Sequence, residues 1–228
     1  MATIVLVHGG FQGGWSFVHL ARALRARGHE VYTPTLTGLG ERSHLASHAI
    51  NLDTHIADIA NVLLWEDLSE VILLGHSYGG MVITGVAERM PERIASLVYM
   101  DAVVPKDGEN LLTIRSEFRD LFLSLGAEHK GQFIAPFPAA THEAKAEAHR
   151  WLDAKTVPHP FACFLQSITV SEVQANLRRV FIYADGGWFG PRYEAFRGST
   201  NAEVHMVTDS GHSLQIDQPE RVANILSS

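Results

Sequence analysis

The sequence Val71-Ile72-Leu73-Leu74-Gly75-His76-Ser77-Tyr78-Gly79-Gly80 runs from an unbroken apolar segment into a turn of small residues. Residues 71–74 show no polar alternation, which is typical of a parallel strand buried on both faces. Residues 81–90 form a predicted helix of small residues that ends before Pro91. The spacing is therefore Gly-x-Ser-x-Gly between a strand and a helix, which predicts a sharp turn that presents the Ser77 hydroxyl above a sheet.

The two glycines and the following helix suit this turn to nucleophilic chemistry. A side chain at position 75 or 79 would collide with neighbouring backbone in so sharp a turn, so glycine is required at both. Ser77 also lies at the positive end of the predicted helix, which favours developing negative charge. We therefore predict that Ser77 is a nucleophile, activated when a base removes its proton. The alternative interpretation is a serine that caps the helix.

The rest of the chain alternates between apolar strands and amphipathic helices. We predict six strands, at 3–7, 30–33, 71–74, 95–100, 180–184 and 203–207. This alternation implies right-handed crossovers and a mostly parallel α/β sheet with helices on both faces. Residues from about 105 to 171 interrupt the pattern with helical patches, prolines and aromatic side chains. We interpret them as a helical cap inserted in a single domain, 1–228.

Composition restricts the expected partners and location. The chain has 228 residues, with 18 Lys and Arg against 25 Asp and Glu, and a formal net charge of −7. This acidic balance disfavours nucleic acid, and no apolar run reaches the roughly 18 residues of a membrane span. The single cysteine, Cys163, forms no internal disulfide, and the first residues lack a secretory leader pattern. We expect a soluble, cytoplasmic protein without nucleic-acid or membrane partners; its oligomeric state, a homodimer included, stays open.

The base that activates Ser77 should follow another strand, because active sites of open parallel sheets lie at the carboxyl ends of the strands. The chain has 13 histidines. His212 is the best placed of them, because it lies between the last predicted strand and the last predicted helix. His76 adjoins Ser77, but we expect its side chain to point away from the site. The cap histidines are expected in solvent: His129, His142, His149 and His159.

These motifs resemble the α/β-hydrolase superfamily. The matching segments are Val7-His8-Gly9-Gly10, Gly14-Trp15, residues 75–80 and Ser210-Gly211-His212. More narrowly, the chain resembles the branch of plant methylesterases and hydroxynitrile lyases, and residues 33–42 and 97–102 resemble its bacterial esterase members. The resemblance covers almost the whole chain and is weakest in the cap. It implies a serine esterase with an oxyanion hole formed by the backbone N–H groups of Gly10 and Tyr78, and a structural role for His8.

Two positions separate this chain from the lyases of that branch. In those lyases a lysine follows the catalytic histidine and a threonine follows the first-strand histidine. Here the corresponding residues are Ser213 and Gly9. Both differences favour ester hydrolysis over cyanohydrin cleavage.

The acid that should orient His212 is absent from its usual place in the family. That place aligns with Gly187, which has no carboxylate. Two candidates remain: Asp185 in the same loop and Asp101 at the end of the preceding strand. We favour Asp101, because a charge just past an all-apolar strand is costly without a partner. The alternative roles are a turn residue for Asp185 and a cap of a turn or helix for Asp101.

Aromatic and apolar residues predict the substrate class. The candidates for substrate binding are Gly9, Phe11, Trp15, Phe122, Trp151 and Trp188. The cap supplies further apolar residues, which either line a pocket or form the core of the cap itself: Phe118, Leu121, Phe133, Phe137, Phe161, Phe164 and Leu165. They favour a small, uncharged, hydrophobic carboxylic ester or carbamate. No basic residue is clearly placed to hold a phosphate or carboxylate.

No metal or organic cofactor is implied, because metal-ligand motifs are missing and residues 9–14 lack the spacing of a dinucleotide-binding turn. Three alternatives stay open besides the esterase. They are a hydroxynitrile lyase-like enzyme, an acyl-transfer enzyme, and a non-catalytic protein that binds small molecules on the same fold.

Overall fold

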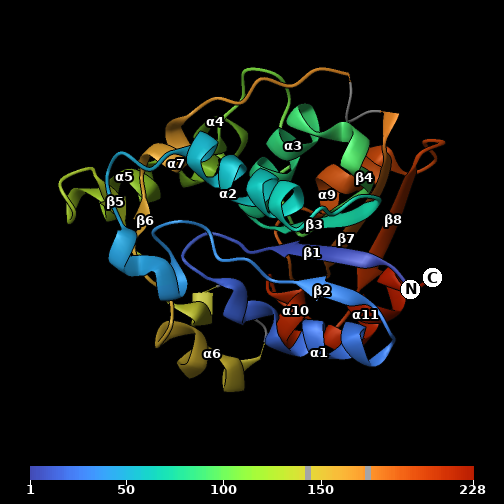
Figure 1. Ribbon diagram of the computed structural model, residues 1–228. Helices are drawn as coiled ribbons and strands as arrows, with labels where there is room; N and C mark the ends of the chain where they lie inside the picture. The colour runs from blue at the N-terminus through green and yellow to red at the C-terminus, as the bar shows by residue number, and fades with distance from the viewer. Residues whose placement is uncertain (142–144, 173–175) are drawn as a thin grey trace.

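The computed structural model describes residues 1–141, 145–172 and 176–228 and is built around a parallel sheet (Figure 1). In these residues the sheet has six strands in the order β2-β1-β3-β4-β7-β8, with every neighbouring pair parallel. The strands are β1 Thr3–Val7, β2 Glu30–Tyr32, β3 Val71–His76, β4 Ile94–Met100, β7 Arg178–Ala184 and β8 Ala202–Val207. The α/β fold with a mostly parallel sheet of about six strands is thereby confirmed.

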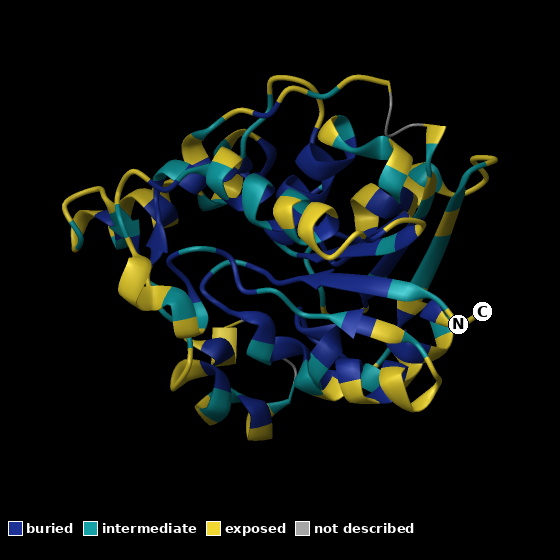
Figure 2. Ribbon diagram, viewed as in Figure 1, coloured by how far each residue is buried: buried dark blue, intermediate teal, exposed yellow. Residues whose placement is uncertain are grey.

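Helices cover both faces of this sheet (Figure 1). One face carries α1 Val18–Ala26, α10 Leu214–Asp217 and α11 Pro219–Leu226, and the other carries α2 Leu52–Trp65, α3 Gly79–Arg89 and α9 Gly190–Tyr193. Along β1, Ile4 and Leu6 join one buried cluster while Val5 and Val7 join the other. Burial on both faces explains why the central strands are apolar without alternation (Figure 2).

Local signals in the sequence set the ends of several helices. The Asn51 side chain accepts the Thr54 N–H at 3.1 Å, and the Thr54 hydroxyl accepts the Asn51 N–H at 3.4 Å. This capping box satisfies two donors at the start of α2. Gly28 follows α1 with a φ of 83°, a left-handed conformation in which glycine carries no Cβ penalty. Pro219 starts α11, where its missing N–H costs nothing.

Some elements differ from the sequence-based boundaries. Strand β7 begins at Arg178 rather than Val180, because backbone pairing does not require apolar side chains and Arg178 forms an ion pair with Glu203 of β8 at 2.7 Å. Short segments carry no periodicity, so α10 and the 3₁₀ turns were not predicted. These turns are η1 Gly14–Phe17, η2 Gly40–Leu45, η3 Pro91–Arg93, η4 Ser116–Phe118, η5 Ala139–Thr141 and η6 Glu194–Phe196. In the described ranges no helix is long and apolar enough to cross a membrane.

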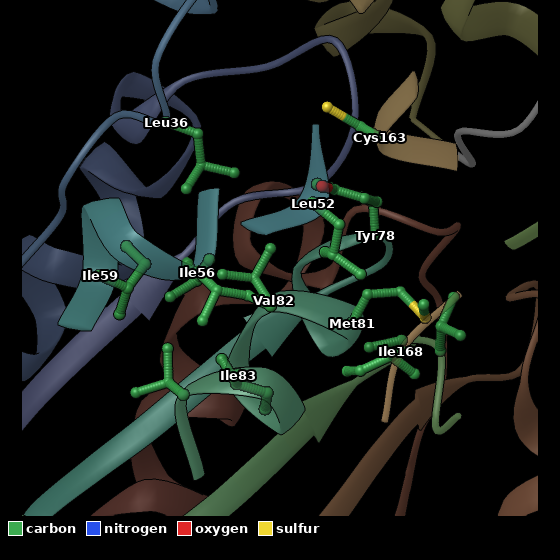
Figure 3. Close-up of a cluster of buried hydrophobic side chains, with 14 of the residues drawn as sticks. Leu36, Leu52, Ile56, Ile59, Tyr78, Met81, Val82, Ile83, Cys163 and Ile168 are labelled. Atoms are coloured by element: carbon green, nitrogen blue, oxygen red, sulfur yellow. The ribbon is translucent and has the colours of Figure 1, made fainter. Parts of the chain in front are cut away.

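The segment between β4 and β7 lies over the carboxyl edge of the sheet (Figure 1). It contains α4 Leu111–Ile114, α5 Arg119–Ala127, α6 Ala146–Asp153 and α7 Ala162–Leu165, with an antiparallel pair of short strands, β5 Phe133–Ile134 and β6 His159–Pro160. Ile134, Cys163 and Phe164 are buried in the same cluster as Tyr78 and α2. Figure 3 shows Cys163 and Tyr78 beside Leu52 of α2. The cap thus continues the main core of the molecule.

Candidate active site

Ser77 stands at a strained corner between β3 and α3. Its φ is 53°, a left-handed conformation that is unfavourable for a residue with a side chain. A Cβ at Gly75 would lie 2.5 Å from the Gly79 carbonyl oxygen, and a Cβ at Gly79 would lie 2.6 Å from the Val7 carbonyl oxygen. Both glycines are therefore required by close backbone contacts, as the sequence analysis expected, and the corner packs directly on the end of β1.

A hydrogen-bonded pair of His212 and Asp101 lines the same edge of the sheet. His212 Nδ1 lies 2.6 Å from Asp101 Oδ2, and both side chains are buried. The Asp101 carboxylate also accepts the backbone N–H groups of Trp188, at 2.9 Å, and Phe189, at 3.1 Å. Three N–H donors therefore hold the buried carboxylate in place. With Nδ1–H donating to Asp101, Nε2 is the His212 nitrogen that would act as the base.

Asp185 has a different position and different partners. Its carboxylate accepts the N–H groups of Gly186, at 3.1 Å, of Asp209, at 3.3 Å, and of Ser210, at 3.4 Å. The residue is exposed, and these contacts hold the loop that leads to His212. Of the two candidate acids, Asp101 is the one that the structure brings to His212.

Gly187 leaves room for the Asp101 carboxylate. A Cβ at this position would lie 2.6 Å from both carboxylate oxygens of Asp101. No side chain at 187 fits while the Asp101 carboxylate occupies this space. The carboxylate from β4 therefore fills the space next to the loop position at which the family usually places its acid.

The N–H groups of Gly10 and Tyr78 lie at the loops after β1 and β3. In the part of the chain that the structure describes, neither N–H has a hydrogen-bond acceptor within the protein. Gly10, Ser77 and Tyr78 line one cavity with His212. Unused backbone donors beside a serine hydroxyl are suited to a developing oxyanion.

Two buried histidines fasten the loop that carries Gly10. His8 Nδ1–H donates to the Gly9 carbonyl at 2.8 Å, and its Nε2 accepts the Leu36 N–H at 3.0 Å. Burial lowers the pKa of His8 to about 4, so the ring is neutral and keeps both bonds. His159 Nδ1 accepts the Phe11 N–H at 3.2 Å, next to Gly10. His8 has the structural contacts expected of it.

Two expectations about histidines were wrong. His159 is fully buried rather than solvated, because the cap lays it over the Gly10 loop. His76 faces the cavity: its ring centroid lies 4.7 Å from that of His212, and its Nε2–H donates to the His212 carbonyl at 3.0 Å. The absence of a side chain at Gly9 leaves room for this ring, since a Cβ there would lie 2.8 Å from His76 Nδ1. His142 lies outside the described residues.

The Tyr78 side chain extends away from Ser77 into a polar cluster under the cap. Its hydroxyl donates to His55 Nδ1 at 3.0 Å, and His55 Nε2–H donates to the Thr37 carbonyl at 3.0 Å. Burial lowers the pKa of His55 to about 4 and raises that of the Cys163 thiol to about 12, so both are neutral. In the described residues, His55, His159 and Cys163 bring three possible metal ligands within 4.8 Å of one another. Both nitrogens of His55 already serve hydrogen bonds that anchor Tyr78.

The cavity above Ser77 has a largely aromatic wall. Its lining residues are Gly9, Gly10, Phe11, Gln12, His76, Ser77, Tyr78, Val103, Leu111, Arg115, Phe118, Phe122, Phe137, Phe164, Trp188, Phe189 and His212. Trp188 stacks on the His212 ring with 4.1 Å between centroids. Gly9, Phe11, Phe122 and Trp188 therefore lie where the sequence analysis expected substrate-binding residues.

Trp15 and Trp151 are absent from this wall, which corrects their expected place. Their rings pack edge to face, with centroids 4.9 Å apart, in a small cluster with Leu152 of α6. They fasten the cap to the loop after β1 instead, because α6 lies beside that loop. Of the other apolar cap residues, Leu121 and Leu165 are exposed and Phe161 is buried in the core.

Sequence reasoning missed two polar residues of the cavity, Gln12 and Arg115. Both are buried, and Gln12 Oε1 and Arg115 Nη1 have no hydrogen-bond partner among the described residues. The sequence analysis found no basic residue clearly placed to hold a phosphate or carboxylate and did not single out Arg115, which lines the cavity. The only signal was weak: Arg115 precedes Phe118 by three residues in an aromatic-rich segment, a spacing that allows a cation to lie over a ring.

Comparison with known proteins identifies the family. A family model described as "Alpha/beta hydrolase family" matches residues 4–225. The chain belongs to the alpha/beta hydrolase family. The resemblance predicted from the sequence is thereby confirmed.

The similar proteins of the alpha/beta hydrolase family include bacterial and plant members. The carbendazim hydrolyzing esterase of Nocardioides sp. (strain SG-4G) is 38% identical over 240 residues, which cover 100% of this chain and 99% of that protein. Salicylic acid-binding protein 2 of Nicotiana tabacum is 31% identical over 119 residues, or 51% of this chain and 45% of that protein. A solved extracellular alpha/beta-hydrolase from a Paenibacillus species shares the fold, with a TM-score of 0.86, 23% identity, and coverage of 99% and 98%.

Proposed function

We propose that this protein is a serine esterase that hydrolyses small, uncharged, hydrophobic carboxylic esters or carbamates through an acyl-enzyme intermediate. The observation that carries the proposal is the buried His212–Asp101 pair, 2.6 Å between Nδ1 and Oδ2, whose His212 lines one cavity with Ser77. A hydroxyl, an imidazole and a carboxylate in this order form the arrangement that makes serine nucleophilic.

In the first step, Ser77 Oγ attacks the substrate carbonyl carbon and its proton passes to His212 Nε2. The Asp101 carboxylate holds Nδ1–H and stabilises the imidazolium that forms. The two backbone N–H groups that donate to Asp101 fix this carboxylate, so the imidazole ring keeps one orientation.

The carbonyl oxygen becomes negative as the tetrahedral intermediate forms. The N–H groups of Gly10 and Tyr78 donate to it, and each donor of this kind lowers the barrier by about 3–4 kcal/mol. Two supports keep these donors in place: His8 and His159 hold the Gly10 loop, and His55 anchors the Tyr78 side chain. The donors are thus arranged before the substrate arrives.

The intermediate collapses when His212 gives its proton to the departing alcohol and the bond between the carbonyl carbon and that oxygen breaks. Water then attacks the acyl-enzyme, again with His212 as base, and the acid leaves as Ser77 regains its proton. The mechanism uses no metal or organic cofactor. The aromatic wall of the cavity favours an apolar substrate.

The relatives support ester hydrolysis, since one is named an esterase and is similar over the whole chain. Ser213 and Gly9 stand where lyases of the branch carry lysine and threonine, which disfavours the lyase alternative. Analysis of the products distinguishes an acid and an alcohol from a carbonyl compound with cyanide, or from a transferred acyl group. The composition supports the further proposal that the protein works in the cytoplasm without nucleic-acid or membrane partners.

The Ser77→Ala variant tests the proposal directly. We expect the rate of p-nitrophenyl acetate hydrolysis to fall by roughly 10⁴-fold or more, because the nucleophile is lost. The matched control is Ser124→Ala, which removes an exposed hydroxyl from α5 and should leave the rate unchanged. A fluorophosphonate should label the native protein and the control but not Ser77→Ala. Unchanged hydrolysis or labelling in Ser77→Ala would contradict the assignment, and a native protein that binds esters without cleaving them would indicate a binding protein.

A further inference from the structure

Arg115 places a buried cation in the wall of the candidate active site. It directly follows α4, and its side chain is only 10% exposed. It lines the same cavity as Ser77 and His212. Its Nη1 is buried and has no hydrogen-bond partner among the described residues. A guanidinium N–H that has lost water without gaining an acceptor is costly, so this atom suits a partner that arrives with the ligand.

The guanidinium is held by its other contacts. Its Nε–H donates to Glu117, and its Cζ lies 4.3 Å from the Phe118 ring centroid and 4.8 Å from that of Phe189. A cation between aromatic faces and a carboxylate has few other positions available. The guanidinium therefore keeps its place in the cavity wall without substrate, which makes it a preformed donor.

Contacts also connect this donor to the reacting groups. Arg115 Cζ lies 5.5 Å from the Trp188 ring centroid, and Trp188 stacks on His212 at 4.1 Å. The guanidinium is thus one aromatic ring away from the imidazole. A substrate whose carbonyl carbon lies at Ser77 can reach Arg115 with a group beyond its reacting ester.

We propose that the Arg115 guanidinium is a specificity determinant that donates an N–H to an uncharged hydrogen-bond acceptor on the substrate, a carbonyl oxygen or an aromatic ring nitrogen remote from the scissile carbonyl. This inference rests on the proposed esterase function and narrows its substrate class to acceptor-bearing aromatic esters and carbamates. An uncharged acceptor fits better than a carboxylate for two reasons. Glu117 already balances the guanidinium charge, and the rest of the wall is largely apolar, so a second carboxylate would lose its water without a free cation.

The test uses two matched pairs of esters that differ by one ring nitrogen. Methyl nicotinate against methyl benzoate places the acceptor on the acyl side, and pyridin-3-yl acetate against phenyl acetate places it on the alcohol side. The preference is the ratio of kcat/KM within each pair. Comparing this ratio between native protein and variants cancels the intrinsic reactivity of each ester.

The variant is Arg115→Met, which keeps length and apolar contacts but removes the donor. We expect it to lower the preference for the acceptor-bearing ester in at least one pair by about 10- to 100-fold, mainly through KM, the range for a hydrogen bond from a charged group. Arg115→Lys should restore part of the preference. The matched control is Arg119→Met, an exposed arginine in the same cap, which should leave both ratios unchanged. Circular dichroism and thermal unfolding verify that each variant is folded.

Two results overturn the inference. One is a folded Arg115→Met whose ratios in both pairs stay within twofold of the native ratios. The other is a native protein that prefers a carboxylate-bearing ester, monomethyl terephthalate, over methyl nicotinate, because the acceptor would then be an anion.

A binding measurement separates this inference from the proposed function. In the Ser77→Ala background, calorimetry should show tighter binding of the acceptor-bearing ester, and Arg115→Met should abolish the difference. If the native protein hydrolyses both esters and Ser77→Ala does not, but the binding difference is missing, the esterase function stands and the role of Arg115 fails. If no ester is hydrolysed but the binding difference is present, the role of Arg115 in binding stands and the esterase function fails.

Discussion

The edge of the sheet and the cap hold their functional side chains by different means. At the sheet edge, backbone contacts position Ser77 and Asp101: glycines pack against carbonyl oxygens, and two N–H groups hold the carboxylate. In the cap, ring contacts position the side chains, as for Phe122 against Phe164 and for Arg115 between two aromatic faces. Backbone contacts leave little freedom, whereas packed rings can be exchanged one by one. The edge should therefore determine the rate of the chemistry, and the cap the choice of substrate.

The largest effect should come from the carboxylate at the edge. We expect Asp101→Asn to lower kcat by roughly 10⁴-fold, because the amide can neither favour the required tautomer of His212 nor stabilise the imidazolium. The matched control is Asp185→Asn, which weakens contacts in an exposed loop and should change kcat by less than about tenfold. Initial rates on p-nitrophenyl acetate measure both. A near-native rate for Asp101→Asn would remove its catalytic role and end the contrast between the two acids.

The next effect concerns the stability of the protein at low pH, to which His8 at the sheet edge contributes. His8 is neutral in the folded protein because burial lowers its pKa to about 4, whereas its pKa is near 6.5 in the unfolded chain. As the pH falls from 6.5 to 4, His8 becomes protonated in the unfolded chain but stays neutral in the folded protein. The free energy of unfolding should therefore decrease as the pH falls through this window, by up to about 3 kcal/mol from His8 alone. Above pH 6.5 His8 is neutral in both states, so it causes no loss of stability there.

Urea unfolding at several pH values between about 7 and 4.5 measures this dependence. In His8→Gln the free energy of unfolding should depend less steeply on pH, since the variant lacks the proton uptake of the native histidine. His48→Gln, which removes an exposed histidine, should retain the native slope. An identical slope in His8→Gln and the native protein would show that His8 does not supply this term.

The smallest effect should come from the cap. Phe122→Ala removes a buried ring of the cavity wall, and we expect KM for an aromatic ester to rise about tenfold while kcat changes by less than threefold, because lost apolar contact weakens ground state and transition state alike. Leu121→Ala on the same helix removes an exposed side chain and should alter neither constant. If kcat falls tenfold with KM unchanged, the division of roles between edge and cap is wrong.

Much of the edge was predictable because its signals are local. The strand, turn and helix around Ser77 follow each other in the chain. Their glycines are required by close backbone contacts, and this requirement can be read from the residue types alone. The place of His212 followed from a rule of parallel sheets, that loops at the carboxyl ends meet. The choice between Asp101 and Asp185 was open, since both lie at strand ends and only the structure places one of them against the imidazole.

The cap was less predictable because its side chains meet across long stretches of sequence. Trp15 and Trp151 were expected at the cavity but pack on each other, and His159 was expected in solvent but bonds to Phe11. Aromatic composition predicted an apolar wall without identifying its members. Arg115 carried almost no sequence signal, because the residue type does not show whether an arginine is buried or exposed.

The amino-acid sequence by itself determined the family, the parallel α/β sheet and the strand-to-helix corner at Ser77, because these depend on periodicity and on local backbone geometry. Only the tertiary structure decided that Asp101 contacts His212, that Gly187 leaves room for that carboxylate, and that Arg115 faces the cavity. Each of these depends on the distance between side chains far apart in the chain, and that distance exists only after the sheet, loops and cap have packed together.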